Sequence, residues 1–370
     1  MNSKSFKSLN LPDALMRVLK NLNFTEMTEV QATCIPAIRE GQDLIVQSKT
    51  GSGKTAAFVF PALEKIILTQ NNPQILILCP TRELCDQVAK ECLKFSKYFT
   101  NLNSVALIGG QPAQPQINSL MRGVNLIIGT PGRTLEHLRS GYIDVSGLKT
   151  LILDEADRLL EEGFSEEIKA IIDSLPKNRQ TLFFSATYPP SMKEFSERYQ
   201  KNVQRITIKD PENSKPMIEQ FVYSAEKPEK LEVLNKILKN HPSNCTLIFC
   251  RTKNAVNEIG KMLKDSGISS RTLHADLQQV DRDQATTMFR EGRLQILVAT
   301  DVAARGLDIA RIQLVINFDL PPSPDIYIHR IGRTGRAGRS GVAVSIATEY
   351  EIPLVAEIEA ATGIKMMSKT

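Results

Sequence analysis

The chain has 370 residues, enough for two or three domains, and its 42% hydrophobic and 24% charged composition is typical of a globular protein with a large core. Its net charge of +5 is compatible with a polyanionic partner but does not require one. The six cysteines include no CxxC pair and the four histidines form no cluster, which argues against a zinc site. No apolar run approaches the length of a membrane span, and we expect a soluble cytoplasmic or nuclear protein with free thiols and no membrane partner.

The N-terminal segment combines an amphipathic stretch, residues 14–22, with the aromatic residues Phe6 and Phe24 and with Gln31. Phe24 could stack on a nucleotide base, and the Gln31 amide can donate one hydrogen bond and accept another. The alternative is that Phe24 belongs to the core beside the amphipathic helix. The segment is thus a candidate base-binding site.

A glycine-rich stretch, residues 48–55, lies between a predicted strand at 44–46 and a predicted helix at 56–68. Its glycines allow backbone N–H groups to surround phosphate oxygens, and the helix N-terminus adds partial positive charge. Lys54 can reach the β- and γ-phosphates of a nucleotide, and the Thr55 hydroxyl can ligate Mg²⁺. A flexible turn that contains a lysine is the alternative. We predict a phosphate-binding loop made of Ser48, Lys49, Thr50, Gly51, Ser52, Gly53, Lys54 and Thr55.

Strand-like apolar runs and helical stretches alternate along the rest of the chain, which predicts an α/β fold with mainly parallel sheets and helices on both faces. The predicted strands of the first series are residues 75–79, 104–108, 126–128, 150–153, 181–185 and 203–208. Those of the second series are residues 220–223, 246–249, 271–273, 295–299, 314–318 and 342–346. The clearest predicted helices are residues 82–98, 230–239, 254–266, 281–290 and 352–362.

A polar segment with two prolines, residues 209–217, separates the two series and reads as a linker. We therefore expect one domain at residues 1–208, a second at 218–363 and a short tail at 364–370. Only the first domain contains a phosphate-binding loop.

One apolar strand of the first domain ends in two carboxylates, Asp154 and Glu155. Asp154 can hold Mg²⁺ through water, since Mg²⁺ keeps much of its hydration shell. Glu155 can orient or deprotonate an attacking water molecule. A helix cap is the alternative interpretation of an acidic strand end. The presence of the phosphate loop in the same domain favours the metal and water roles.

A stretch rich in glycine and arginine, residues 329–339, follows in the second domain. Its short spacings indicate that several guanidinium groups converge on one anion. Arginines that reach a γ-phosphate from a second domain would stabilise the transition state and make hydrolysis depend on domain closure. A solvated basic loop is the alternative.

Together these motifs resemble the DEAD-box family of ATP-dependent RNA helicases, from Phe6 to about Gly341. In the first domain the resemblance covers the adenine-recognition motif (Phe6, Phe24, Gln31), the phosphate loop, the RNA-contact motifs (residues 80–84, 109–110 and 130–133), the name-giving tetrad (154–157) and the coupling motif (185–187). In the second domain it covers residues 247–250, Gln279 with Arg282, residues 300–308 and residues 329–336.

The resemblance implies two tandem RecA-like domains that use ATP and Mg²⁺. It implies that Lys54, Glu155, Arg333 and Arg336 are catalytic, that Phe24 and Gln31 bind adenine, and that Asp308 contacts the ribose. It also implies that ATP and RNA binding are coupled through Asp157, Ser185, Thr187 and His329. RNA would be held by its sugar–phosphate backbone, without sequence preference, by Arg82, Gly110, Thr130, Arg133, Arg282 and Thr300. The family further implies protein partners within a ribonucleoprotein.

The function expected is ATP hydrolysis stimulated by RNA, coupled to domain closure and to local duplex unwinding or ribonucleoprotein remodelling. A second possibility is an ATP-dependent RNA clamp with little unwinding, since the same residues would serve it. A phosphotransferase or DNA translocase is disfavoured by the Gln31 region, the tetrad and the coupling motif. Within the family, residues 159–164, 188–189 and 247–250 resemble the DEAD-box subunit of the SMN complex.

Overall fold

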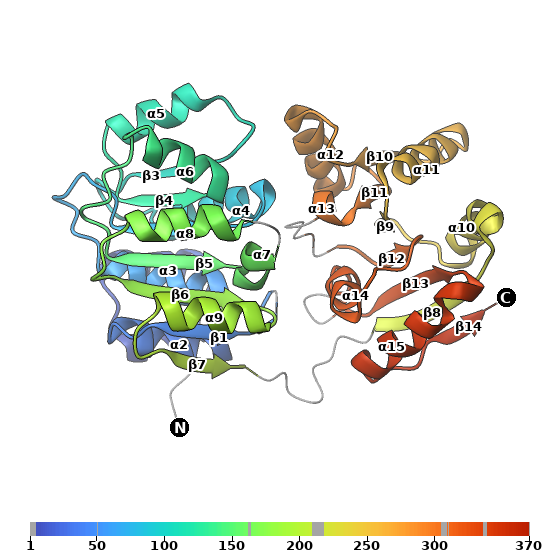
Figure 1. Cartoon of the computed structure of the whole chain (residues 1–370), viewed down its shortest axis with the longest axis horizontal. Coiled ribbons are helices and arrows are strands. Elements are labelled where there is room, and N and C mark those ends of the chain that lie inside the picture. The colour runs from blue at the N-terminus through green and yellow to red at the C-terminus, as the bar shows by residue number, and fades with distance from the viewer. Residues whose placement is uncertain are drawn as a thin grey trace. The chain divides into compact units, whose positions relative to one another are not determined.

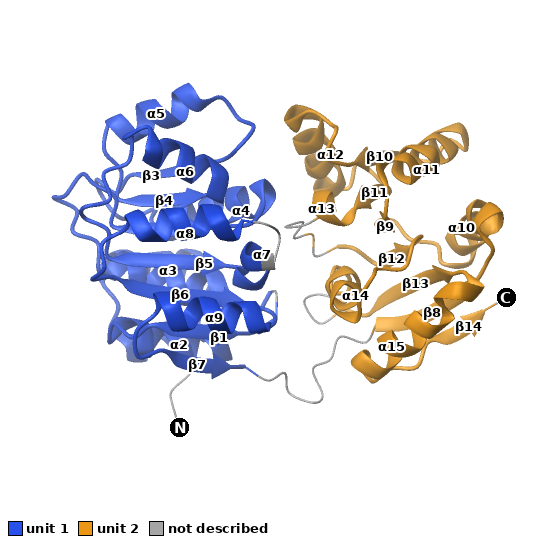
Figure 2. Cartoon of the chain, in the orientation of Figure 1, with its two compact units in different colours: residues 1–209 blue, residues 210–370 orange. Residues whose placement is uncertain are grey.

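The computed structural model describes residues 5–49, 51–161, 164–208, 218–304, 309, 311–335 and 339–369. The chain divides into two compact units, Met1–Lys209 and Asp210–Thr370 (Figure 2). The division lies beside the predicted linker, whose residues are outside the described part of the chain.

Unit 1 alternates strands and helices along its whole length (Figure 1). In chain order its elements are η1 (Phe6–Leu9), α1 (Asp13–Asn21), α2 (Glu29–Arg39), β1 (Leu44–Gln47), α3 (Lys54–Glu64), β2 (Ile75–Leu78), α4 (Arg82–Phe95), β3 (Ser104–Leu107), α5 (Ala113–Met121), β4 (Leu126–Gly129), α6 (Pro131–Arg139), β5 (Thr150–Asp154), α7 (Ala156–Glu161), α8 (Ser165–Ser174), β6 (Gln180–Ser185), α9 (Pro190–Tyr199) and β7 (Gln204–Thr207).

Its seven strands form one parallel sheet in the order β3-β4-β2-β5-β6-β1-β7. Alternate strand residues enter two separate cores. Val46, Ile77 and Phe184 pack with α2, α3 and α4, whereas Ile45 and Phe183 pack on the other face with residues of α8 and α9. Because both faces are covered, the central strands are apolar at nearly every position. All their carboxyl ends lie at one edge, where the following loops gather.

Unit 2 repeats this plan with fewer helices among its described residues. Its elements are β8 (Ile218–Ser224), η3 (Lys227–Glu229), α10 (Lys230–Asn240), β9 (Thr246–Cys250), α11 (Lys253–Asp265), β10 (Ser270–Leu273), α12 (Gln279–Glu291), β11 (Ile296–Thr300), α13 (Asp301–Ala304), β12 (Leu314–Asn317), α14 (Pro324–Ile331), β13 (Gly341–Ala347), η4 (Glu349–Glu351), α15 (Ile352–Thr362) and β14 (Met367–Lys369). The strands form a second parallel sheet in the order β10-β11-β9-β12-β13-β8-β14. The α/β architecture predicted from the sequence is confirmed for both units.

Two local features differ from the sequence prediction. The helix predicted at 56–68 is α3, which already begins at Lys54 and ends at Glu64. It stops there because the Gln74 side chain accepts a hydrogen bond from Ile67 N (2.8 Å) and donates one to Ile67 O (2.9 Å), which fixes that stretch as a loop. The segment predicted as a tail after residue 363 contains β14, which pairs with β8.

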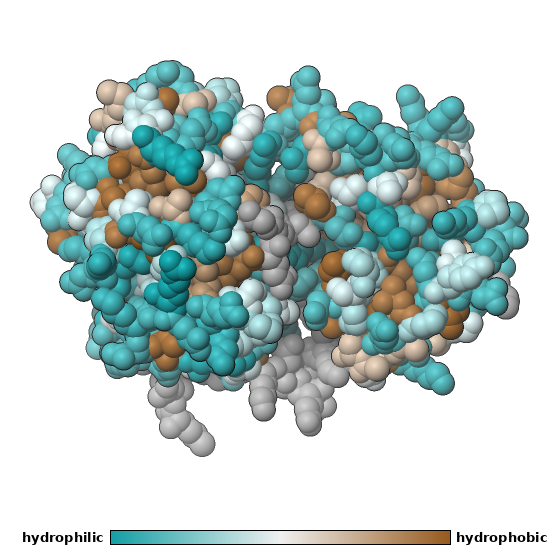
Figure 3. All heavy atoms as spheres, in the orientation of Figure 1, coloured by the Kyte–Doolittle hydropathy of each residue, from teal (hydrophilic) through white to brown (hydrophobic). Residues whose placement is uncertain are grey.

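The face shown in Figure 3 is covered mainly by hydrophilic residues, with apolar residues in small scattered groups. None of the helices in the described ranges has the length and apolar character that a membrane span requires.

Candidate active site and RNA-binding edge

The phosphate loop connects the carboxyl end of β1 to the first turn of α3. Lys54 is buried, and its Nζ donates to Ser48 O at 2.8 Å, so the loop folds back onto its own lysine. Gly51 and Gly53 have φ values of +77° and +93°, which favour glycine over any other residue. The N-terminus of α3 faces this loop and favours an anion there. Thr50 lies outside the described residues.

Gln31 lies in the first turn of α2 and contacts the phosphate loop. Its Oε1 accepts from Thr28 N at 3.0 Å, which caps the helix, and its Nε2 donates to Gly53 O at 3.2 Å. Both ends of the amide are therefore engaged within unit 1. Its predicted contact with adenine stays a prediction.

The sequence left open whether Phe24 belongs to the core or is available to stack on a base. Phe6 is buried and packs edge-on against Phe60, with ring centroids 5.9 Å apart. Phe24 stacks on Phe6 at 6.4 Å but remains 39% exposed. Phe24 is thus an exposed aromatic surface supported by the core, which suits a stacking role.

The carboxylate of Asp154 ends β5 inside the sheet and is 4% exposed. Burial raises the pKa of Asp154 to about 7, although the nearby charge of Lys54 opposes this shift. Its Oδ1 accepts from Glu155 N at 3.0 Å. A bound cation would replace the lost hydration of this carboxylate, so the donor set fits the predicted Mg²⁺, with Thr55 in α3 as the second candidate ligand.

Glu155 occupies a strained turn between β5 and α7. Its φ is +51°, a left-handed conformation that is costly for a residue with a side chain. Glu155 Oε2 forms an ion pair with Arg158 Nη1 at 2.7 Å, and both side chains are about nine-tenths buried. Sequence reasoning missed Arg158, although its position three residues after Glu155, at the start of a helix, was a usable signal.

Asp157, Ser185 and Thr187, three of the predicted coupling residues, form one hydrogen-bonded group. Asp157 Oδ2 accepts from Thr187 Oγ1 at 2.6 Å and from Thr187 N at 2.9 Å, and Asp157 N donates to Ser185 Oγ at 3.3 Å. Burial opposes ionisation of Asp157, but these hydrogen bonds and the charge of Arg158 outweigh it and hold the pKa of Asp157 below its usual value. The group is joined to the phosphate loop because Ser48 N donates to Ser185 O at 2.9 Å.

The four candidate RNA-contact residues of unit 1 follow the neighbouring strands β3, β4 and β2. Gly110 has φ +78°, and a Cβ there would lie 2.2 Å from Arg82 Nη1, so the guanidinium rests on the glycine. Thr130 Oγ1 accepts from Gly109 N at 3.2 Å and donates to Leu107 O at 3.3 Å, which fastens these loops together. Arg133 Nε pairs with Glu136 at 3.0 Å, while its Nη1 is buried without a hydrogen-bond partner.

In unit 2 the described candidates lie on separate elements. Thr300 ends β11, Arg282 is in α12 and contacts Gln279 Oε1 at 3.4 Å, and His329 is in α14. Arg333 follows α14 and is buried. Asp308 and Arg336 lie outside the described residues.

One guanidinium group of the arginine-rich stretch, that of Arg330, has its partners inside unit 2. Arg330 is buried, and it binds Asp301 through two hydrogen bonds, from Nε at 2.6 Å and from Nη2 at 2.7 Å. Its Nη1 also donates to Asn317 Oδ1 at 3.1 Å and Asp319 O at 2.6 Å. The charge of Arg330 is therefore paired inside unit 2, where this side chain connects α14 to Asp301.

These groups occupy one edge of the sheet in unit 1. The phosphate loop, the tetrad and the coupling motif follow the neighbouring strands β1, β5 and β6, and the candidate RNA contacts follow the adjacent β2, β4 and β3. The candidate nucleotide-binding groups and the candidate RNA contacts are therefore neighbours along a single sheet.

Comparison with known proteins agrees with this arrangement. Residues 28–195 match the family model "DEAD/DEAH box helicase", and residues 229–338 match "Helicase conserved C-terminal domain". The chain is 45% identical over 349 residues to the ATP-dependent RNA helicase DbpA of Escherichia coli K12, covering 94% of this chain and 76% of DbpA. It is 42% identical to DeaD of Buchnera aphidicola, covering 98% of this chain and 60% of that protein.

Solved structures are similar over nearly the whole chain. S. cerevisiae Dbp5 bound to RNA and ADP BeF3 matches with a TM-score of 0.87 and 30% identity, covering 99% of this chain and 96% of that chain. Mss116p bound to single-stranded RNA and AMP-PNP matches with a TM-score of 0.88 and 28% identity, covering 99% of this chain and 78% of that chain. The likeness to the SMN-complex subunit is not tested by these matches and stays a prediction. The chain belongs to the DEAD-box family of ATP-dependent RNA helicases, with two tandem RecA-like domains.

Proposed function

We propose that this helicase hydrolyses ATP only when RNA and ATP together favour a closed arrangement of its two units, and that closure separates short duplexes or remodels ribonucleoproteins. The observation that carries this proposal is the continuous polar edge of unit 1. There the phosphate loop, Asp157 and Thr187 are joined by hydrogen bonds, beside the candidate RNA contacts. Binding at either part of such an edge can favour the same state, so each ligand promotes binding of the other.

When ATP binds, Lys54 would give up its hydrogen bond to Ser48 O and donate to phosphate oxygens instead. The backbone N–H groups of residues 48–53 would surround the phosphates. Phe24 and Gln31 would hold the adenine. Glu155, fixed by Arg158, would orient the attacking water and accept its proton. Asp308 would contact the ribose.

Mg²⁺ would be held by Asp154, through water, and by the Thr55 hydroxyl. When bound, Mg²⁺ neutralises charge on the phosphates. The burial of Asp154 supports this assignment, because burial still raises its pKa to about 7 although Lys54 and the hydrogen bond from Glu155 N favour the ionised form, and a bound cation would favour that form further.

From unit 2, Arg333 and Arg336 would stabilise the charge that develops on the γ-phosphate. His329 would link unit 2 to the tetrad (residues 154–157) and to the coupling motif (residues 185–187). The bidentate contact of Arg330 with Asp301 supports a fixed placement of α14, from which Arg333 extends.

RNA would be bound by its backbone at Arg82, Gly110, Thr130, Arg133, Arg282 and Thr300, independently of sequence and with an affinity that falls as salt rises. Contacts to 2′-hydroxyls would favour RNA over DNA. The RNA-bound structures of Dbp5 and Mss116p support an RNA ligand, and a Dbp5 structure bound to Gle1 supports protein partners for such a core. We extend both to this chain.

The decisive experiment is steady-state ATPase activity with and without single-stranded RNA, for the wild type and Glu155→Gln. We expect strong stimulation by RNA in the wild type and a loss of about 100-fold or more in the variant, with ATP binding retained. Equal stimulation by single-stranded DNA would contradict the RNA selectivity. Absence of stimulation, with ATP binding intact, would contradict autonomous coupling and favour an RNA clamp that needs a partner protein.

A further inference from the structure

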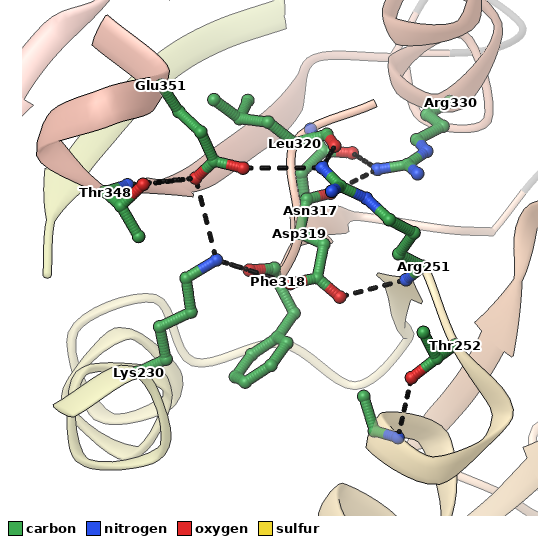
Figure 4. Close-up of polar contacts among 11 residues, drawn as sticks. Lys230, Arg251, Thr252, Asn317, Phe318, Asp319, Leu320, Arg330, Thr348 and Glu351 are labelled. Carbon is green, nitrogen blue, oxygen red and sulfur yellow. Dashed lines mark hydrogen bonds and ion pairs between the residues drawn. The ribbon is translucent and has the colours of Figure 1, made fainter. Parts of the chain in front are cut away.

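A polar network that no motif covers lies at the carboxyl edge of the sheet in unit 2 (Figure 4). At one end is Lys230, the first residue of α10, whose side chain is only 6% exposed. Its Nζ donates to Phe318 O at 3.0 Å and lies 3.3 Å from Asp319 Oδ1 and 3.8 Å from Glu351 Oε2. A buried ammonium group needs such partners, because an unpaired charge in the interior is very costly.

Asp319 connects Lys230 to Arg251 and to Arg330. Its Oδ2 accepts from Arg251 N at 2.9 Å, so Lys230 and the backbone after β9 hold the two carboxylate oxygens. Its own carbonyl oxygen points the other way and accepts from Arg330 Nη1 at 2.6 Å. The side chain of Asp319 thus fixes the backbone that Arg330 binds.

Glu351 closes the network on the side away from Arg330. Its Oε2 accepts from Thr348 N at 3.0 Å and Thr348 Oγ1 at 3.1 Å, which caps η4. Its Oε1 lies 3.4 Å from Arg251 Nη2, which also donates to Leu320 O at 3.1 Å. The half-exposed Arg251 guanidinium therefore covers the network from the solvent side.

Arg330 connects the network to residues of known motifs. It grips Asp301, the residue after Thr300, and it lies in α14 next to His329 and three residues before Arg333. The three cations Lys230, Arg251 and Arg330 balance the three anions Asp301, Asp319 and Glu351. An ion network of this kind, buried at Lys230 and Arg330 and half-exposed at Arg251, contributes little net stability compared with apolar packing, which makes a role in positioning the better explanation.

We propose that Lys230, Asp319 and Glu351 are positioning residues for catalysis: they fix the backbone that anchors Arg330 and thereby set where α14 presents His329 and Arg333. This inference depends on the proposed role of Arg333 as a catalytic arginine. In this proposal Arg251, which belongs to none of the candidate catalytic residues, covers the network on its solvent side.

The test compares Lys230→Met and Glu351→Gln with Lys253→Met. Lys253 pairs with Asp276 in the same unit, but both of these side chains are 57% exposed and neither contacts Arg330. We expect Lys230→Met and Glu351→Gln to lower the RNA-stimulated kcat about tenfold, because small displacements of a catalytic group are costly, while KM for ATP changes less than about twofold. Lys253→Met should keep the wild-type kcat.

Two further measurements separate positioning from simple destabilisation. Urea unfolding should show that the variants remain folded under assay conditions. The double variant Lys230→Met/Glu351→Gln should keep the low kcat although it removes the charge of one of the two carboxylates that Lys230 contacts. If Lys230→Met does not fold, Glu351→Gln provides the same test. Folded variants with wild-type kcat would overturn the proposal. Arg333→Ala distinguishes the two levels: if it retains full RNA-stimulated activity, the catalytic role of Arg333 is wrong, whereas an inactive Arg333→Ala beside a fully active Lys230→Met refutes the positioning network alone.

Discussion

Arg158, in the first turn of α7, holds the carboxylate of Glu155, the residue that precedes this helix, through an ion pair of 2.7 Å. Glu155 has a left-handed backbone conformation with φ +51°, which is costly for a residue with a side chain. The side chain of its neighbour Asp154 is buried in the sheet. The turn therefore places the proposed catalytic carboxylate beside Arg158, which pairs with it. We expect Arg158 to orient this carboxylate toward the attacking water.

We predict that Arg158→Met lowers the RNA-stimulated kcat by about tenfold and leaves KM for ATP within about twofold, because the carboxylate loses its orientation but not its chemistry. The measurement is steady-state ATPase activity at saturating RNA. Lys169→Met is the matched control, since Lys169 pairs with Glu166 at the same helical spacing on the surface of the same unit. A higher ATPase rate without RNA in Arg158→Met would contradict this prediction, because it would mean that Arg158 restrains Glu155.

The alternation of apolar runs with helical stretches was sufficient to predict both sheets, because strands that are buried on two faces are apolar along their length and stand out in the sequence. The strand predicted at 150–153 is β5, which extends to Asp154. The pattern excluded Asp154 because it is charged, yet the carboxylate is buried there with a hydrogen bond from Glu155 N. β14 could not be predicted, since its three residues are all exposed and show no apolar alternation.

The motifs located the candidate site, but side-chain partners distant in sequence could not be predicted from them. The glycine- and arginine-rich stretch predicts that several of its guanidinium groups converge on one anion, but it does not show which of them pair inside unit 2. The carboxylate partner of Arg330 is Asp301, 29 residues earlier; the two are brought near by the sheet, in which Asp301 follows β11 and Arg330 follows β12, with β9 between these strands. Lys230 and Glu351 are still further apart and show no motif at all.

The contact of Gly110 with Arg82 gives a second prediction. Alanine at Gly110 would place its Cβ 2.2 Å from Arg82 Nη1 and would also strain the backbone at φ +78°. We expect Gly110→Ala to displace the guanidinium and to weaken RNA binding about tenfold, whereas ATP binding without RNA stays unchanged. Fluorescence anisotropy of labelled single-stranded RNA with a non-hydrolysable ATP analogue measures this. Gly141→Ala is the control, because Gly141 has a similar φ of +73° but open space around it; equal losses in both variants would attribute the effect to backbone strain.

Gln31 joins a helix cap to the phosphate loop, and two variants separate these functions. Gln31→Glu keeps an acceptor for Thr28 N but loses the donor to Gly53 O, so we expect near wild-type stability and weaker ATP binding. Gln31→Ala loses both contacts and should also lower the free energy of unfolding by about 1 kcal/mol. Calorimetric titration with ATP and urea unfolding measure the two effects. Wild-type ATP affinity in Gln31→Glu would show that the contact with Gly53 is dispensable.

The lowered pKa of Asp157 predicts how stability depends on pH. The hydrogen bonds from Thr187 favour the ionised carboxylate in the folded state, so the unfolded state binds its proton more tightly. The stability contributed by Asp157 is thus complete above its ordinary pKa of 3.8 and is lost as pH falls through the lower folded value. The free energy of unfolding of the wild type should exceed that of Asp157→Asn by about 1–3 kcal/mol at pH 7, and this difference should shrink below about pH 4.

Thr187→Val removes one of the two groups of Thr187 that donate to Asp157, and it should show a smaller pH-dependent loss. Because the chain contains no Trp, far-UV circular dichroism in urea follows the unfolding. A difference between wild type and Asp157→Asn that is constant from pH 7 to pH 3 would show that the pair is held by shape alone and not by the charge of Asp157.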